Sequence, residues 1–199
     1  GDKSGSFNIS STCSLILASA DAYVAKHGNR SITSNSGSAD MLEAIGIRLD
    51  LDVNQQTTLL EETGFTFLFA GNHHPAMKHI IPIRKSIPHR TIFNILGPLT
   101  NPAGVKKQFV GSYDKEFVSP MAQVLAKTGS THCLVASSYD GLDELSLSAP
   151  SFITQIHDGL KKEYELDPQS LGFEHSTLED IKGGDAKENA AITLSLLKG

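Results

Sequence analysis

Short apolar runs alternate with amphipathic stretches along the whole chain of 199 residues. The clearest run is Phe65–Phe69, where aromatic side chains recur at every second position and indicate a β-strand. Two further runs flank Asp158-Gly159, a dipeptide typical of a tight hairpin. Together the pattern predicts strands over residues 23–27, 65–69, 108–111, 131–136, 152–156 and 160–166.

Helices are predicted between these strands from their capping residues. Small polar residues at 8–12 precede the apolar run 15–20, and Ser36–Asp40 precedes Met41–Ile45. Gly46 and Gly64 are placed to end helices, and Gly184-Asp185 to begin the last one. The expected helices cover residues 10–21, 41–45, 54–63, 75–86, 116–127 and 184–197.

Strands separated by helices favour an α/β fold, in which a mixed, largely parallel sheet carries helices on both faces. The terminal hairpin implies some antiparallel pairing. We expect residues 1–199 to form one such domain, because no repeat or low-complexity tract divides the chain.

Composition excludes several classes of protein. Lys and Arg total 17 against 22 Asp and Glu, and the resulting charge of −5 argues against a nucleic-acid partner. The longest uncharged apolar stretch, residues 11–20, is about half the length that a membrane span needs, so we expect no membrane association. Cys13 and Cys133 lie far apart and are expected to be buried packing residues, as is usual in a reducing cytosol.

Two segments favour an anion. Residues 1–11 combine small residues with Ser and Asn at a helix start, where free N–H groups attract phosphates. Lys26–Arg30 places two cations, an amide and a glycine after a strand, and Ser36–Ser38 opens a further helix. A capped surface loop or a solvated turn could carry the same residues, but the combination indicates a ligand with phosphates at two ends.

A third segment, Asp140–Glu144, clusters three carboxylates just after a strand. Hard oxygen donors suit Mg²⁺, which bridges carboxylates to substrate phosphates, although a solvated loop is the simpler interpretation. His73, His74 and His79 do not have the spacing of a helical metal site, so we do not expect a metal there. Arg90 could bind a carboxylate bidentately, although such an arginine is more often a surface residue.

Seven blocks occur in one order along the chain, and together they resemble the anthranilate phosphoribosyltransferase family. The blocks are residues 1–10, Lys26-His-Gly-Asn-Arg30, Ser36–Asp40, His73–Met77, the Arg90-Thr-Ile-Phe-Asn94 stretch to Pro102, Asp140-Gly-Leu-Asp-Glu144 and Gly183–Ala190. The resemblance implies a nucleoside-phosphorylase-like catalytic domain. It also implies transfer of the phosphoribosyl group of 5-phosphoribosyl 1-pyrophosphate (PRPP) to anthranilate, in tryptophan biosynthesis.

The resemblance also implies the site residues. PRPP would be bound by Gly1, Asp2, Ser6, Asn8, Ile9, Ser10, Ser11, Lys26, His27, Gly28, Asn29, Arg30, Ser34 and Ser38. Asn29 and Arg90 would contact anthranilate, with His27 nearby. Mg²⁺ would be held by Ser10, Asp143 and Glu144, and no residue is implied as a general base.

The family pattern extends beyond this chain at both ends, so we expect a domain that lacks the family's leading helical domain and its final helices. Members of the family form homodimers through that helical domain and act in the cytoplasm. Two rivals stay open: a pyrimidine nucleoside phosphorylase-like enzyme, and a non-catalytic paralogue that binds nucleic acid. The charge of −5 and the pair Asp143-Glu144 argue against the nucleic-acid-binding paralogue. The same pair, together with Arg90, argues against the nucleoside phosphorylase-like enzyme.

Overall fold

The computed structural model describes residues 4–31, 35–87, 89 and 91–199. The chain divides into two compact units. Unit 2 comprises Gly5–Phe93, Asn101–Ala103 and Gly183–Gly199, and unit 1 is built from Asn94–Thr100 and Gly104–Lys182.

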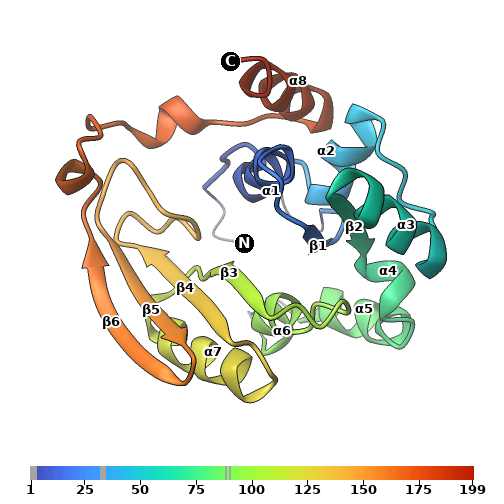
Figure 1. The fold of residues 1–199 in the computed structure, drawn as a ribbon, viewed down its shortest axis with the longest axis horizontal. Coiled ribbons are helices and arrows are strands. Elements are labelled where there is room, and N and C mark those ends of the chain that lie inside the picture. Colours follow the sequence, from blue (N-terminus) through green and yellow to red (C-terminus); the bar gives the residue numbers. More distant parts are fainter. Residues whose placement is uncertain (1–3, 32–34, 88, 90) are drawn as a thin grey trace. The chain divides into compact units, whose positions relative to one another are not determined.

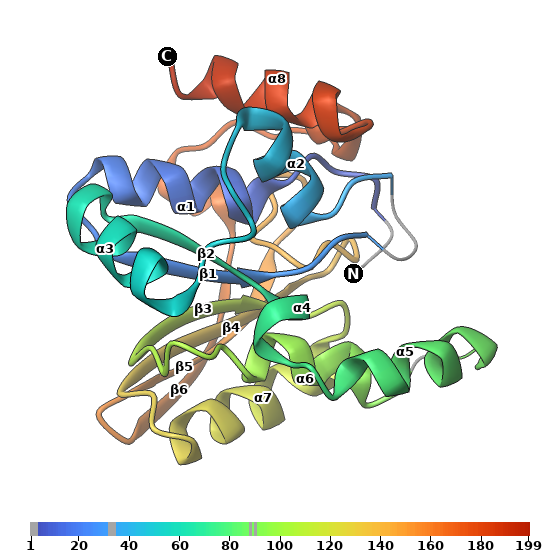
Figure 2. The same cartoon turned by 90° about the vertical axis from the view of Figure 1, so that its right-hand side faces the viewer.

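Unit 2 contains a short parallel sheet with helices packed against it. Strand β1 (Val24–Gly28) pairs in parallel with β2 (Phe65–Phe69), whose first four residues are buried. Figure 2 shows α1 (Ile9–Ser19) along this pair, and α3 packs against β2. The other helices of the unit are α2 (Ser38–Ile45), α3 (Val53–Thr63), α4 (Ala70–His73), α5 (Met77–Ser86) and α8 (Ala186–Leu196).

Unit 1 contains a four-stranded sheet in the order β3-β4-β5-β6 (Figure 1). Strands β3 and β4 are parallel, whereas β4–β5 and β5–β6 are antiparallel. Helix α7 packs on β4 and β5 through Val118, Met121 and Leu125, which are buried with Cys133 and Val135. The bounds are β3 (Lys107–Gly111), β4 (His132–Ser138), β5 (Ser151–His157), β6 (Leu160–Leu166), α6 (Phe93–Leu99) and α7 (Lys115–Lys127), with short 3₁₀ turns at Pro168–Leu171 and Leu178–Ile181.

The α/β class with mixed pairing is confirmed, and the described strands fall into two sheets. Gly46 and Gly64 cap α2 and α3 in the left-handed conformation, as predicted. The hairpin between β5 and β6 turns at Asp158 and Gly159, which both have positive φ.

Other expectations were incomplete. Helices α4 and α6 were not predicted, because α4 has four residues and α6 contains Gly97 and Pro98. Cys133 is buried as expected, but the expectation for Cys13 is wrong: it lies on the exposed side of α1. In the described part of the chain, the longest apolar helices are too short or too polar to cross a bilayer.

Candidate functional site

The start of α1 brings together two groups predicted from separate segments. Lys26, on β1, donates from Nζ to Ser10 Oγ at 3.1 Å, and Ser10 is an exposed residue of the first helical turn. The helix begins after Asn8, whose carbonyl accepts from the N–H groups of Ser11 and Thr12 at 3.1 and 3.0 Å. A cationic group therefore stands at the positive end of a helix, where an anion is favoured.

Ser11 adds a second observation at the same helix start. The residue is 1% exposed, and its Oγ has no hydrogen-bond partner among the described residues. A buried hydroxyl without a partner costs free energy, and functional sites are a common reason for one. Ser6 and Ile9, which flank this turn, are half-buried.

Strand β1 carries the next predicted residues. Lys26, His27 and Gly28 form its last positions rather than a loop, and Gly28 lies against α2. A Cβ at Gly28 would approach Ser38 Oγ to 2.2 Å, so the strand and the start of α2 are in close contact. Ser38 Oγ in turn donates to the carbonyl of Asn29 at 3.3 Å.

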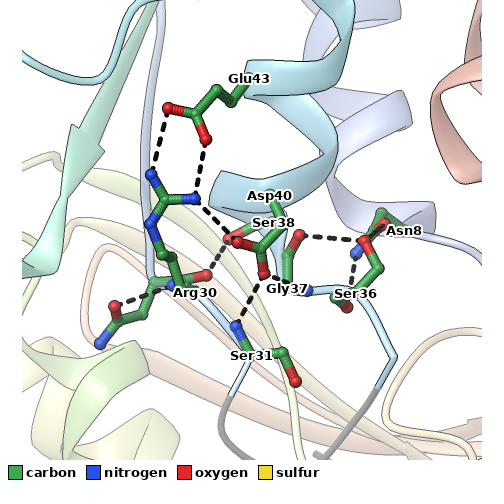
Figure 3. Close-up of polar contacts among 9 residues, drawn as sticks. Asn8, Arg30, Ser31, Ser36, Gly37, Ser38, Asp40 and Glu43 are labelled. Atoms are coloured by element: carbon green, nitrogen blue, oxygen red, sulfur yellow. Dashed lines mark hydrogen bonds and ion pairs between the residues drawn. The ribbon is translucent and has the colours of Figure 1, made fainter. Parts of the chain in front are cut away.

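Arg30 is held by carboxylates on α2. Figure 3 shows its guanidinium donating to Glu43 at 2.8 and 3.1 Å and to Asp40 at 2.9 Å. These bonds raise the pKa of Arg30 above its usual value, Glu43 contributing most. Arg30 was predicted to bind PRPP, and in this structure its guanidinium braces the loop against α2.

Asp40 closes the loop that follows Arg30. Its carboxylate accepts from the N–H groups of Ser31 at 3.0 Å and Gly37 at 2.9 Å, one at each end of the loop (Figure 3). Burial opposes ionisation of Asp40, but these bonds and the one from Arg30 hold the pKa of Asp40 below its usual value. Four of the predicted site residues, Gly1, Asp2, Ser34 and Arg90, lie outside the described residues.

His27 has a partner that sequence reasoning missed. Its Nε2 lies 3.2 Å from Nε2 of His74, and the two rings meet edge to face with centroids 5.1 Å apart. His74 had been considered as a metal ligand and belongs to the block His73–Met77, but neither observation predicted its contact with His27. The neighbouring His73 is desolvated by burial, which, together with the adjacent His74, lowers its pKa. The sequence gives no signal of the contact between His27 and His74, because the contact depends on how β1 and α4 pack in the fold.

Asp143 and Glu144 lie in the segment between β4 and β5 of unit 1, and both are half-buried. A Cβ at Gly111, the last residue of β3, would lie 1.5 Å from the carbonyl oxygen of Asp143. Glycine therefore allows the backbone of Asp143 to rest directly on the sheet.

Asp140 begins the same segment but points into it. Its carboxylate accepts from Ser146 Oγ at 2.6 Å, from Ser148 Oγ and from the N–H of Leu142 at 3.1 Å. Burial opposes ionisation, yet these hydrogen bonds hold the pKa of Asp140 below its usual value. Asp140 thus orders the segment, while Asp143 and Glu144 are the carboxylates predicted to bind Mg²⁺.

These carboxylates can take part in a Mg²⁺ site only with help from other ligands. Within the described residues, no cluster of three or more His, Cys, Asp or Glu side chains could hold a metal ion. Two adjacent carboxylates fit Mg²⁺ when substrate phosphates and waters complete its six oxygen ligands.

This chain is similar to known proteins along its whole length. The model of the glycosyl transferase family, a/b domain, matches residues 1–199. Relatives named anthranilate phosphoribosyltransferase from Thermoanaerobacter sp. (strain X514) and Methanobrevibacter smithii are each 46% identical over 199 residues. Each match covers 100% of this chain and 59% of the relative, so the chain spans about three fifths of their length.

Solved structures are similar over the same extent. The crystal structure of anthranilate phosphoribosyltransferase from Thermus thermophilus has a TM-score of 0.92 and 42% identity, and the match covers 100% of this chain and 58% of that one. The Saccharomyces cerevisiae enzyme in complex with PRPP and Mg has a TM-score of 0.87 and 28% identity. This match covers 98% of this chain and 54% of that one.

Proposed function

This chain belongs to the glycosyl transferase family as its a/b domain, and we propose that its protein is an anthranilate phosphoribosyltransferase of tryptophan biosynthesis. The reaction joins the amino nitrogen of anthranilate to C1′ of PRPP, giving N-(5-phosphoribosyl)anthranilate and expelling pyrophosphate. The relatives at 46% identity carry that name, and one similar structure holds PRPP and Mg.

One observation in this chain carries the proposal: the hydrogen bond from Lys26 to Ser10 at the start of α1, next to Ser11, whose buried hydroxyl has no hydrogen-bond partner among the described residues. A lysine ammonium and a helix start both favour a phosphate, and Ser11 offers a hydrogen-bond donor without a described partner. Around them we assign PRPP binding to the predicted set: Gly1, Asp2, Ser6, Asn8, Ile9, Ser10, Ser11, Lys26, His27, Gly28, Asn29, Arg30, Ser34 and Ser38.

Within this set, Arg30 has a supporting role. Its guanidinium is used by Asp40 and Glu43, so we infer that it holds the loop after β1, while the half-buried Lys26 supplies the cation at the start of α1. One end of the Asn29 amide is also used within the protein, because its Oδ1 accepts from the N–H of Arg30 at 2.8 Å. Its amide NH₂ group is the part that could contact anthranilate, as the resemblance implies.

The acceptor side of the proposal rests on Asn29, Arg90 and His27. The edge-to-face contact between His27 and His74 presents aromatic surface beside the end of β1. An aromatic amine is neutral at pH 7, so the reaction needs positioning of the two substrates more than a strong base. This agrees with the absence of an implied general base in the motifs.

Mg²⁺ is the cofactor that we propose, held by Asp143 and Glu144 together with Ser10. The metal supplies positive charge that stabilises the departing pyrophosphate. Asp140 and Gly111 would contribute by fixing the backbone that carries the two carboxylates. We also infer a cytoplasmic enzyme that forms homodimers through a helical domain, without nucleic-acid or membrane partners.

The test is consumption of anthranilate, followed by its fluorescence, in the full natural polypeptide with PRPP and Mg²⁺. We expect turnover in the wild type and its loss, by at least about 100-fold, in the Asp143→Asn/Glu144→Gln double variant, since charge stabilisation of a leaving group has that magnitude. Lys161→Gln, an exposed change on β6, is the control and should retain turnover.

Three outcomes would contradict the proposal. Full turnover in the double variant would remove the metal role of the carboxylates. Thermal stabilisation by uridine with phosphate, but not by PRPP with Mg²⁺, would favour a nucleoside phosphorylase instead, and a salt-sensitive gel shift would favour nucleic-acid binding.

A further inference from the structure

The block Gly183–Ala190 has no role in the proposed function, although it is one of the seven that carry the resemblance. In the structure it forms the start of α8, which lies in the same unit as α1. Asp185 caps the helix by accepting from the N–H groups of Lys187 and Glu188. Capping explains Asp185 and Glu188, but it does not explain Asn189.

Asn189 is a buried polar residue with both ends of its amide in use. It is 2% exposed; its Oδ1 accepts from the N–H of Gly184 at 2.8 Å, and its Nδ2 donates to Oδ1 of Asn8 at 2.9 Å. Asparagine is a poor helix former, and a buried amide is tolerated only when it is hydrogen-bonded. Its neighbour Ala190 packs in the apolar core of the unit. The NH₂ group of the Asn189 amide is thus used by Asn8, which lies 181 positions away in the sequence.

Asn8 is in turn held from a second side. Ser36 Oγ donates to Asn8 Oδ1 at 3.2 Å, and Asn8 Nδ2 donates to the Ser36 carbonyl at 3.4 Å (Figure 3). Two donors from distant segments therefore fix the orientation of one amide. Asn8 is the residue from which α1 begins, so its position sets that of the first helical turn.

The backbone of the block Gly183–Ala190 also packs closely against the segment before Asn8. The N–H of Gly183 donates to the carbonyl of Gly5 at 2.8 Å. A Cβ at Gly183 would lie 2.6 Å from the Cα of Phe7 and from Oδ1 of Asn189, so no larger residue fits without displacing the segment.

We propose that Asn189 is a positioning residue which, with Gly183, braces Gly5–Asn8 and so places the phosphate-binding start of α1. This inference rests on the proposed function for its kinetic consequence, but its structural part does not. Asn189 touches no substrate and acts through Asn8. Its loss should weaken binding of PRPP while the chemistry that follows binding is retained.

A matched control lies one helical turn further along. Thr193, which is fully buried, forms a hydrogen bond of 2.8 Å with Thr12, again across 181 positions. Thr12 also donates to the carbonyl of Asn8 at 3.1 Å, and we expect this bond to remain when Thr193 is changed. Thr193→Val therefore removes a buried polar contact between the same two helices without touching the Asn8 amide.

The experiment compares Asn189→Ala with Thr193→Val in the full natural polypeptide. We expect Asn189→Ala to raise KM for PRPP about tenfold, with kcat and KM for anthranilate changed less than about threefold, the pattern of lost binding. Both variants should lower Tm by a similar amount. Thr193→Val, however, should leave KM for PRPP within about twofold of the wild-type value. Equal effects of the two variants on KM for PRPP would overturn the inference.

Amide hydrogen exchange in the ligand-free protein separates this inference from the proposed function. Residues 5–9 should exchange about tenfold faster in Asn189→Ala than in the wild type or Thr193→Val. Unchanged exchange overturns the brace whatever the enzyme does, and a wild type without turnover overturns only the proposed function. If Asn189→Ala does not fold, Gly183→Ala tests the same brace through the displacement of Phe7, with the same readouts.

Discussion

Two loops of the chain are each organised by one aspartate, but the donors around the two aspartates differ. In unit 2, Asp40 accepts from two backbone N–H groups and from the guanidinium of Arg30. In unit 1, Asp140 accepts from two serine hydroxyls and one backbone N–H, without a cation among the bonds described. The first arrangement includes an ion pair with a guanidinium, whereas the second uses neutral donors in a segment that packs closely on Gly111.

The two loops should therefore be destabilised by different kinds of change. The loop at Asp40 is linked to Glu43 through Arg30, so it should respond to pH and salt. The segment that contains Asp140 packs directly on Gly111. Its stability should therefore depend on the volume of the side chain at position 111.

The largest effect is expected for Gly111→Ala. The added methyl would lie 1.5 Å from the Asp143 carbonyl oxygen, so the backbone must move. We expect the free energy of unfolding to fall by about 3 kcal/mol, as in strongly overpacked sites. Urea denaturation measures this change, and a Mg²⁺ titration of turnover should show a higher half-saturation concentration.

Gly97→Ala is the control for this prediction. Gly97 lies in α6 of the same unit and has no atom within 4 Å of an added Cβ. The change should alter stability by no more than about 1 kcal/mol, the range of helix propensity. If Gly111→Ala were as stable as Gly97→Ala, packing would not be what holds the Asp143 backbone.

The sequence predicted most elements because their signals are local. The alternating aromatics of β2, the glycines that end α2 and α3, and the Asp158-Gly159 hairpin each act within a few residues. The division of the strands into two sheets is not local, because strand pairing depends on contacts that a single strand does not encode.

The candidate site shows the same limit. Lys26 and Ser10 were selected independently, and the structure places them 3.1 Å apart. By contrast, the contact of Asn189 with Asn8 and that of His74 with His27 join residues 181 and 47 positions apart. The engagement of Arg30 by Glu43 was also missed, because a basic motif does not reveal which acid will neutralise it.

An intermediate effect is expected for Asp40→Asn. The folded pKa of Asp40 is below its unfolded value of about 3.9. Its contribution to stability is therefore fully present above about pH 4 and is lost as the pH falls through the folded pKa. The variant should be less stable than the wild type by about 2 kcal/mol at pH 7, because a charge-assisted bond and a backbone acceptor are weakened.

Urea denaturation at pH 7, 5 and 3 measures this difference, which should shrink at the lowest pH. Asp21→Asn removes an exposed carboxylate from the same unit, outside the loop, and should show a smaller difference at pH 7. A deficit of Asp40→Asn that stayed constant down to pH 3 would show that charge is not what Asp40 contributes.

The smallest effect is expected for Glu43→Gln. Glu43 holds Arg30 in a bidentate pair, and the hydrogen bonds from Arg30 lower the pKa of Glu43. More than half of the Glu43 side chain is exposed, however, so solvent and salt screen the pair. The variant should lower Tm less than Asp40→Asn does. The decrease should become smaller between about 0.05 and about 0.5 M salt, because the Debye length falls from roughly 14 to roughly 4 Å. A decrease in Tm that is the same at both salt concentrations would mean that Glu43 holds Arg30 by geometry alone, and the contrast between the charged loop of unit 2 and the packed segment of unit 1 would then be lost.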